Sequence, residues 1–172
     1  YPVEAAHVVL EDPFSLVGHT LADTYRIERV IGRGGMGMVL AAWQLDMQRR
    51  VAIKVPSVDG RPAGPELLAR FAREARCAAA IDSEHVCRAL DTGTLDDGTP
   101  FLVLEYLEGH DVGKELGARD RLPAAEAVEL VRQACSAVRA AHGIGIVHRD
   151  IKPENLFLTE RADGTRVLKL LD

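Results

Sequence analysis

The sequence predicts an α+β protein: a mostly antiparallel sheet with one helix, followed by a helical second part. Residues 25–107 contain short apolar stretches bounded by Gly and Pro, which is the pattern of strands. An amphipathic stretch that begins at Pro65 predicts one helix among them, and a longer helical repeat begins at Pro123. We therefore expect a leader at 1–24, a sheet-rich part at 25–107 and a helix-containing part at 108–172.

Some expected strands of the first part precede its helix in the sequence, and others follow it. Alternation of apolar and polar residues, interrupted by glycines or turns, places them at 25–31, 39–43, 51–55, 86–90 and 101–106. The last two surround a turn at 96–98. The helix should bury one apolar face, made of Leu67, Leu68, Phe71, Ala75, Ala78 and Ala79.

The second part is expected to begin with a link at 109–117 that glycines interrupt. Its helix should end at Gly143 and Gly145, and two short strands are expected at 156–158 and 167–171. The helical period predicts a buried face made of Ala127, Val128, Val131, Ala134, Cys135, Val138 and Ala141.

Composition narrows the classes of partner. With 47% hydrophobic and 27% charged residues the chain is typical of a globular domain, and a net charge of -5 argues against nucleic acid or anionic lipid as a partner. No apolar run approaches the roughly 20 residues that span a bilayer. Three cysteines without CxxC spacing fit a reducing compartment. We expect no nucleic acid partner, no membrane segment in this chain and a cytoplasmic location, with any membrane anchor outside it.

A glycine-rich turn stands between the first two expected strands. Gly32, Gly34 and Gly37 are spaced as GxGxxG and are followed by Val39. Glycines let backbone N–H groups approach a polyphosphate closely. The pattern alone also fits a plain hairpin turn or a dinucleotide-binding fingerprint, although the latter needs a helix directly after the glycines. No Gly-Lys-Ser/Thr follows, which excludes a Walker A loop.

Lys54 lies within the apolar sequence VAIKV. A buried cation needs an anionic partner, which could be a phosphate or a carboxylate such as Glu74 on the expected helix. Two alternatives remain open. Lys54 could lie on an edge strand and extend to water, and Glu74 could form a local helix pair with Arg70.

The sequence HRDIKPEN, which follows an Ile-Val pair, carries the strongest chemical signal. It places Asp150, Lys152 and Asn155 at fixed offsets. Phosphoryl transfer to a hydroxyl needs a carboxylate that orients the hydroxyl and accepts its proton, a cation near the phosphate, and oxygen ligands for Mg²⁺. These three residues supply all of them. Asp172, which ends the strand-like sequence VLKLL, is expected to be a second carboxylate ligand of the metal.

From Tyr25 to Asp172, the order of glycine loop, VAIK, helix Glu, HRDxKxxN and strand Asp resembles the protein kinase family. The Lys two residues after Asp150 resembles the serine/threonine branch, and the loop IGRGGMGMV is similar to that of bacterial eukaryotic-like kinases. The resemblance implies a two-lobed fold: a five-stranded antiparallel amino-terminal lobe with one helix, and the first part of a helical carboxy-terminal lobe. Leu40 departs from the family, which usually has an aromatic residue there.

The resemblance also implies roles for the matching residues. Asp150 would be the catalytic base, and Lys152 would contact the γ-phosphate. Lys54, paired with Glu74, would hold the α- and β-phosphates, and Asn155 and Asp172 would ligate Mg²⁺. His148 would be structural. ATP would be covered by the loop residues Ile31, Gly32, Arg33, Gly34, Gly35, Met36, Gly37 and Val39. Adenine would contact Val39, Ala52, Phe157, the gatekeeper Leu104, and the backbone of Glu105 and Leu107.

These observations lead to an expected function for the protein to which the chain belongs: ATP- and Mg²⁺-dependent phosphorylation of Ser and Thr hydroxyls of protein substrates. The chain ends where the family's Phe-Gly and activation segment would follow, so we expect it to be inactive or weak by itself. The alternatives are a non-catalytic nucleotide-binding or scaffold module and a small-molecule kinase of similar fold. The oligomeric state is not predicted.

Overall fold

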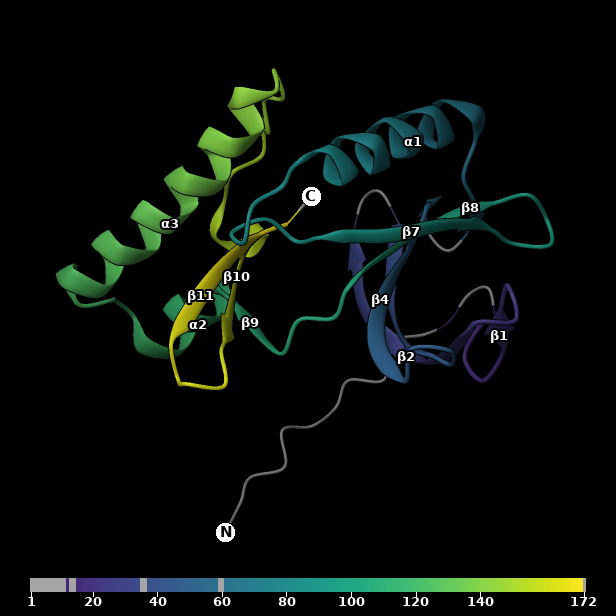
Figure 1. Cartoon of the computed structure of the whole chain (residues 1–172), viewed down its shortest axis with the longest axis horizontal. Coiled ribbons are helices and arrows are strands. Elements are labelled where there is room, and N and C mark those ends of the chain that lie inside the picture. Colours follow the sequence, from purple (N-terminus) through teal and green to yellow (C-terminus); the bar gives the residue numbers. More distant parts are fainter. Residues whose placement is uncertain (1–11, 13–14, 35–36, 59–60, 172) are drawn as a thin grey trace, which may run out of the picture. The chain divides into compact units, whose positions relative to one another are not determined.

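The computed structural model describes residues 12, 15–34, 37–58 and 61–171 (Figure 1). The contacts divide the chain into two units. The first unit holds the described residues up to Phe71 together with Asp91–Val103, and the second holds Ala72–Leu90 and the residues from Leu104 onward. The lobe boundary expected after residue 107 stays a prediction.

Most strands form one sheet, as the α+β prediction requires. Among the described residues this sheet has six strands in the order β1-β2-β3-β4-β8-β7. The pairs β1/β2, β2/β3 and β3/β4 are antiparallel. A separate antiparallel pair joins β5 to β6. The strands are β1 (Thr20–Leu21), β2 (Tyr25–Gly34), β3 (Gly37–Gln44), β4 (Arg49–Val55), β5 (Ser57–Val58), β6 (Arg61–Pro62), β7 (Ala89–Thr94) and β8 (Pro100–Glu105).

The first unit is built around the centre of the sheet. Leu40 on β3 faces Ile53 on β4, and both are fully buried. Tyr25 packs edge-on against Phe101, with ring centroids 6.1 Å apart, and its hydroxyl donates to Asp91 Oδ2 at 2.8 Å. Burial, and then the hydrogen bond to Asp91, raise the pKa of Tyr25 to about 12. The phenol therefore stays protonated and keeps donating this bond.

Helix α1 (Pro65–Ala80) confirms the first predicted helix, with Pro65 as its first residue. Phe71 and Ala75 are buried as expected, but Ala79 is exposed, so the predicted face is wrong at the end of the helix. The turn expected at 96–98 is confirmed, since Gly98 has φ +87° and donates its N–H to Leu95 O.

The second unit contains a three-stranded antiparallel sheet of the order β11-β10-β9. Helix α3 lies against β11, on the left of Figure 1. The elements are β9 (Gly109–Asp111), α2 (Val112–Arg119), α3 (Ala124–Gly143), the 3-10 turn η1 (Pro153–Asn155), β10 (Leu156–Glu160) and β11 (Arg166–Leu170).

One predicted strand begins later in the chain than expected. Strand β7 begins at Ala89, whereas the sequence predicted a strand at 86–90. Val86 instead forms an isolated parallel bridge with Leu170, and Cys87 N donates to Leu170 O at 2.9 Å. The backbone at 86–87 is thus paired with the end of β11, and β7 begins only after these residues.

Helix α2 and strand β9 replace the link that was predicted at 109–117. Gly113 and Gly117 have low helix propensity, so the sequence pattern did not predict this helix. Asp111 caps it, because its carboxylate accepts a hydrogen bond from Lys114 N at 2.8 Å.

Helix α3 has the predicted bounds within one residue. The predicted buried face is confirmed at Ala141, and Ala134 and Val138 pack against the core, but the rest of that face is wrong. Val128 and Val131 are 67% and 61% exposed. Gln133 lies on the buried side, where its Oε1 accepts from Leu168 N at 2.7 Å and its Nε2 donates to Glu129. A polar residue in the buried stripe moved the apparent apolar face by about a quarter turn. The residues that α3 buries are Leu130, Gln133, Ala137 and Ala141.

None of the helices in the described part of the chain is long and apolar enough to cross a membrane.

Candidate nucleotide site and catalytic loop

The glycine sequence forms the end of the β2/β3 hairpin. Gly32 pairs with Val39 and Gly34 with Gly37, while Ile31 lies at an irregularity between Val30 and Gly32. A strand follows the glycines, so the dinucleotide-binding alternative, which needs a helix there, is wrong. The predicted loop residues Gly35 and Met36 lie outside the described residues.

Two described glycines of this hairpin differ in their surroundings. Gly37 has φ +148°, and a Cβ atom at this position would lie 2.1 Å from Val55 O. Gly37 is therefore needed where β3 passes close to the end of β4. A Cβ atom at Gly34 would meet no atom within 4 Å, so the backbone there has open space beside it. Gly34 and the exposed Arg33 lie where a phosphate could approach the backbone.

Lys54 is 3% exposed, on β4, which lies between β3 and β8 in the sheet. The alternative of an edge-strand lysine that extends to water is therefore wrong. Val39 stands directly opposite Lys54, and Ala52 lies two residues along the same strand. Directly opposite residues and residues two apart share a face of a sheet. The sheet thus presents Val39, Ala52 and Lys54 together.

Other predicted site residues lie in the second unit. Glu74 is half-buried on α1, and its pairing with Lys54 stays a prediction. Leu104 and Glu105 end β8, with Leu107 just beyond the strand, and all three are partly buried. Phe157 is partly buried on β10, where it pairs with Asp111 and Lys169.

The HRDIKPEN residues converge on one carboxylate. Lys152 Nζ donates to Asp150 Oδ2 at 2.8 Å, and Asn155 Nδ2 donates to the same oxygen at 3.0 Å and to Asp150 O at 2.8 Å. The side-chain nitrogen of Asn155 is therefore bonded to Asp150. The side-chain oxygen, Oδ1, is the atom of Asn155 suited to a hard cation such as Mg²⁺.

Asp150 has the charge that the predicted role requires. Hydrogen bonds from Lys152, and then from Asn155, hold the pKa of its carboxyl below the usual range. Its side chain is 60% exposed. An ionised and accessible carboxylate can accept a hydrogen bond from an incoming hydroxyl and orient it, with its proton leaving as the oxygen becomes bonded to phosphorus.

His148 connects this loop to the chain that follows β11. Its Nε2 donates to Leu171 O at 2.9 Å, and its Nδ1 lies 3.3 Å from the N–H of Asp150. One ring nitrogen therefore donates and the other accepts. Leu171 N also donates to Asn155 O at 2.9 Å. The predicted metal ligand Asp172 lies outside the described residues, and the residue before it is bonded to this loop on both sides.

Arg149 was not expected to be conformationally special. Its φ is +65°, in the left-handed region that residues with a Cβ atom seldom adopt. Neither Gly nor Asn stands at this position, so no residue type indicated the left-handed conformation. Such backbone strain is common where surrounding contacts hold a functional loop.

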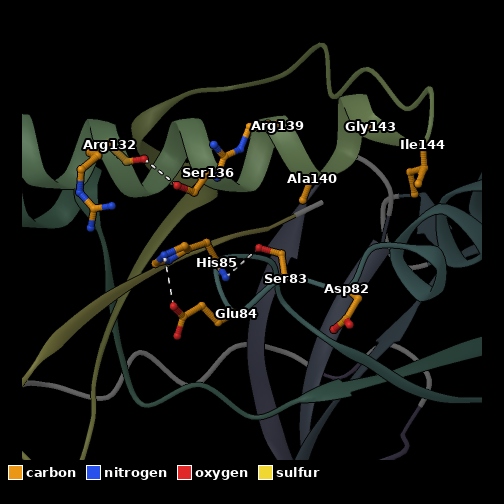
Figure 2. Close-up of a pocket in the computed structure, with 10 residues that line it drawn as sticks. All are labelled: Asp82, Ser83, Glu84, His85, Arg132, Ser136, Arg139, Ala140, Gly143 and Ile144. Carbon is orange, nitrogen blue, oxygen red and sulfur yellow. Dashed lines mark hydrogen bonds and ion pairs between the residues drawn. The ribbon is translucent and has the colours of Figure 1, made fainter.

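A polar pocket lies elsewhere in the second unit, between the loop at 82–85 and α3 (Figure 2). No predicted nucleotide-site or catalytic residue among those that the structure describes lines this pocket. Ser136 bonds Arg132 O within α3, and Arg132 is paired with Glu129. The figure shows Glu84 beside His85, away from these helix residues. This pocket is separate from the catalytic loop.

Comparison with known proteins agrees with the loop geometry. Residues 25–172 match the family model described as "Protein kinase domain". The chain belongs to the protein kinase family. Protein kinases in general use ATP and Mg²⁺.

Several bacterial kinases are similar to this kinase chain. It is 37% identical over 161 residues to the serine/threonine-protein kinase pkn3 of Myxococcus xanthus, covering 94% of this chain and 29% of that protein. It is 33% identical over 155 residues to PknB of Mycobacterium leprae, covering 88% of this chain and 24% of that protein. The chain thus spans less than a third of the length of these relatives.

A solved structure confirms the predicted fold. The crystal structure of the PknI kinase domain of Mycobacterium tuberculosis superposes with a TM-score of 0.74 at 29% identity. The match covers 95% of this kinase chain and 61% of that domain. The fold is therefore that of a kinase amino-terminal lobe and part of the carboxy-terminal lobe.

Proposed function

We propose that this kinase chain supplies the nucleotide-binding and catalytic-loop residues of an enzyme that transfers the γ-phosphate of ATP to Ser and Thr hydroxyls of proteins. The observation that carries the proposal is the arrangement at Asp150, where Lys152 and Asn155 both bond one carboxylate oxygen. The relatives named above are serine/threonine kinases, which supports a protein substrate over the small-molecule alternative.

Each residue then has a defined task. Asp150 orients the substrate hydroxyl and accepts its proton, and Lys152 offsets negative charge on the transferring phosphate. Asn155 and Asp172 would hold Mg²⁺, which would neutralise charge on the phosphate oxygens. Lys54 would bind the α- and β-phosphates together with the glycine loop. The backbone of Glu105 and Leu107 would bond adenine.

The proposed setting is the cytoplasm, where ATP is abundant, and the proposed partners are proteins that expose Ser or Thr. The net charge of -5 offers no general attraction to nucleic acid.

The test is phosphate transfer to a generic protein substrate by the kinase that contains this chain. Asp150→Asn keeps the size of the side chain but removes the base, so we expect the rate to fall by roughly 10²- to 10⁴-fold while MgATP still binds. Asp163→Asn is the matched control. Asp163 is also an exposed carboxylate with a lowered pKa, caused by hydrogen bonds from Thr165, but it lies in the β10/β11 turn.

Equal rates for Asp150→Asn and Asp163→Asn would sink the assigned role of Asp150. If ATP raised the melting temperature of the unsubstituted protein but no transfer occurred to any substrate, the non-catalytic nucleotide-binding alternative would replace the proposal.

A further inference from the structure

The proposed function uses only the backbone of Glu105, but its side chain is also bonded within the protein. Glu105 Oε1 accepts two hydrogen bonds, from Arg88 N at 2.8 Å and from Lys169 Nζ at 2.7 Å. Glu105 N also donates to Arg88 O at 3.0 Å. Both backbone groups of Arg88 are thus bonded to one residue at the end of β8.

The same short segment is bonded on its other side to β11. Leu170 N donates to His85 O at 2.7 Å, and Cys87 N donates to Leu170 O at 2.9 Å. The ring of His85, which also borders the pocket of Figure 2, has Nδ1 3.1 Å from Leu168 O. Residues 85–88 therefore lie between β11 and Glu105 and are bonded to both.

The Lys169–Glu105 ion pair closes this arrangement into a ring. Lys169 lies on β11, and its side chain is 14% exposed, against 28% for that of Glu105. A charge-assisted bond that is largely shielded from water is stronger than an exposed one, and removal of one partner leaves the other charge poorly solvated. The pair thus fixes the distance between the end of β8 and β11.

Two parts of this ring, the chain at Glu105 and strand β11, connect to groups with proposed functions. The carbonyl and N–H groups of the chain at Glu105 and Leu107 are the proposed partners of adenine. Strand β11 continues into Leu171, which is bonded to His148 and Asn155 of the catalytic loop. A displacement at Lys169 would therefore be transmitted to the backbone that reads the base.

We propose that Lys169 and the Glu105 carboxylate are positioning residues that hold the adenine-binding backbone in a fixed position relative to β11, the strand whose continuation at Leu171 is bonded to the catalytic loop. The inference rests on the proposed function, because it assigns the Glu105 segment to adenine. Neither side chain needs to touch the nucleotide. Their contribution is to the selectivity for the base, not to the transfer of the phosphate.

The test compares ATP with inosine triphosphate, both with Mg²⁺, by calorimetric titration of the protein. The two nucleotides carry the same triphosphate, but inosine has an oxo group where adenine has the amino group that donates to a backbone carbonyl. Lys169→Met keeps the length of the side chain and removes its charge. We expect the ratio of ATP affinity to inosine triphosphate affinity to fall by roughly 5-fold, the lower end of the range typical of coupling between a remote residue and a binding site.

Four further measurements make this test specific. Glu105→Gln keeps an acceptor for Arg88 N and should lower the ratio by a similar factor, and the double variant should be no worse than either single one, because the residues act as a pair. Arg132→Met, which breaks the exposed pair with Glu129 on α3, should leave the ratio unchanged. Hydrogen exchange of the Arg88 and Glu105 amides should accelerate in Lys169→Met but not in Arg132→Met.

Contrary results are distinct from one another. If Lys169→Met weakened both nucleotides equally, or left the exchange of these amides unchanged, the positioning role would be overturned while nucleotide binding stood. If the unsubstituted protein bound neither nucleotide, the proposed function would fail, and this inference with it.

Discussion

At the scale of single residues, glycines of one hairpin serve two different physical purposes. Gly37 allows β3 to pass the carbonyl of Val55, since a Cβ atom would lie 2.1 Å from that oxygen. Gly34 has open space beside it and a φ outside the left-handed region. The first glycine is required by the fold, whereas the second fits a need for close approach by a ligand.

Substitution should separate these purposes. Gly37→Ala should lower the free energy of unfolding by at least about 2 kcal/mol, because the added methyl group clashes with backbone and the φ is unfavourable for Ala. Gly34→Ala should change it by less than about 1 kcal/mol but weaken MgATP binding. Urea unfolding and calorimetric titration give the two quantities. Equal destabilisation by both substitutions would contradict the assignment.

At the scale of elements, a charged cluster joins the parts of the second unit. Glu115 on α2 is 9% exposed and accepts hydrogen bonds from Arg119, from His110 on β9 and from Arg166 on β11. Arg119 and Arg166 both also pair with Glu126 on α3. Glu115 thus connects α2 to two strands, and Glu126 extends the cluster to α3.

The stability of this cluster should depend on pH. Hydrogen bonds from Arg119 first, and then from His110, lower the pKa of Glu115 from 4.5 to about 2. A depressed pKa stabilises the fold above the unfolded value, and this contribution is lost as the pH falls from about 4.5 to 2. Glu115→Gln should therefore cost roughly 1–3 kcal/mol at neutral pH and much less at about pH 2.

The control for this prediction is Glu129→Gln. The pKa of Glu129 is also lowered to about 2, by Arg132 and then Gln133, but the Glu129 side chain is 49% exposed. Solvent screening should make this substitution nearly neutral in urea unfolding at both pH values. A larger loss for Glu129→Gln than for Glu115→Gln would refute the proposed importance of burial.

Elements with strong local signals could be predicted, and those set by tertiary contacts could not. Pro65 and Gly98 fix backbone geometry by themselves, and the helix and turn that they predicted are confirmed. The buried face of α3 includes Gln133, whose partner Leu168 is distant in sequence, so periodicity alone chose the wrong face. The start of β7 is delayed because Cys87 bonds to Leu170, a contact that local patterns do not contain.

Site residues follow the same rule. The grouping of Asp150, Lys152 and Asn155 could be predicted, because the three residues lie within one short loop, while their catalytic roles stay predictions. The shared use of Asp150 Oδ2 by Lys152 and Asn155 depends on the fold of the loop. The ion pair of Lys169 with Glu105 joins residues 64 positions apart and gave no signal in the sequence.

At the scale of the whole molecule, the proposed function depends on whether separate elements bind one ligand. The hairpin at Gly34 and the buried Lys54 belong to the first unit, and the loop at Asn155 belongs to the second. Each unit has the features expected of its half of the site: an open backbone and a buried cation in one, and an ionised carboxylate with an amide oxygen in the other. The function requires both halves to contact the same triphosphate.

The most direct measurement replaces Mg²⁺ with paramagnetic Mn²⁺ in the ATP complex and records amide signals by NMR, with Mg²⁺ as the diamagnetic reference. Because broadening falls steeply with distance from the metal, it reports which amides lie near the triphosphate. We expect the amide signals of both Gly34 and Asn155 to broaden together at the same nucleotide concentration. Broadening of only one of the two, with the other unchanged at saturation, would contradict it.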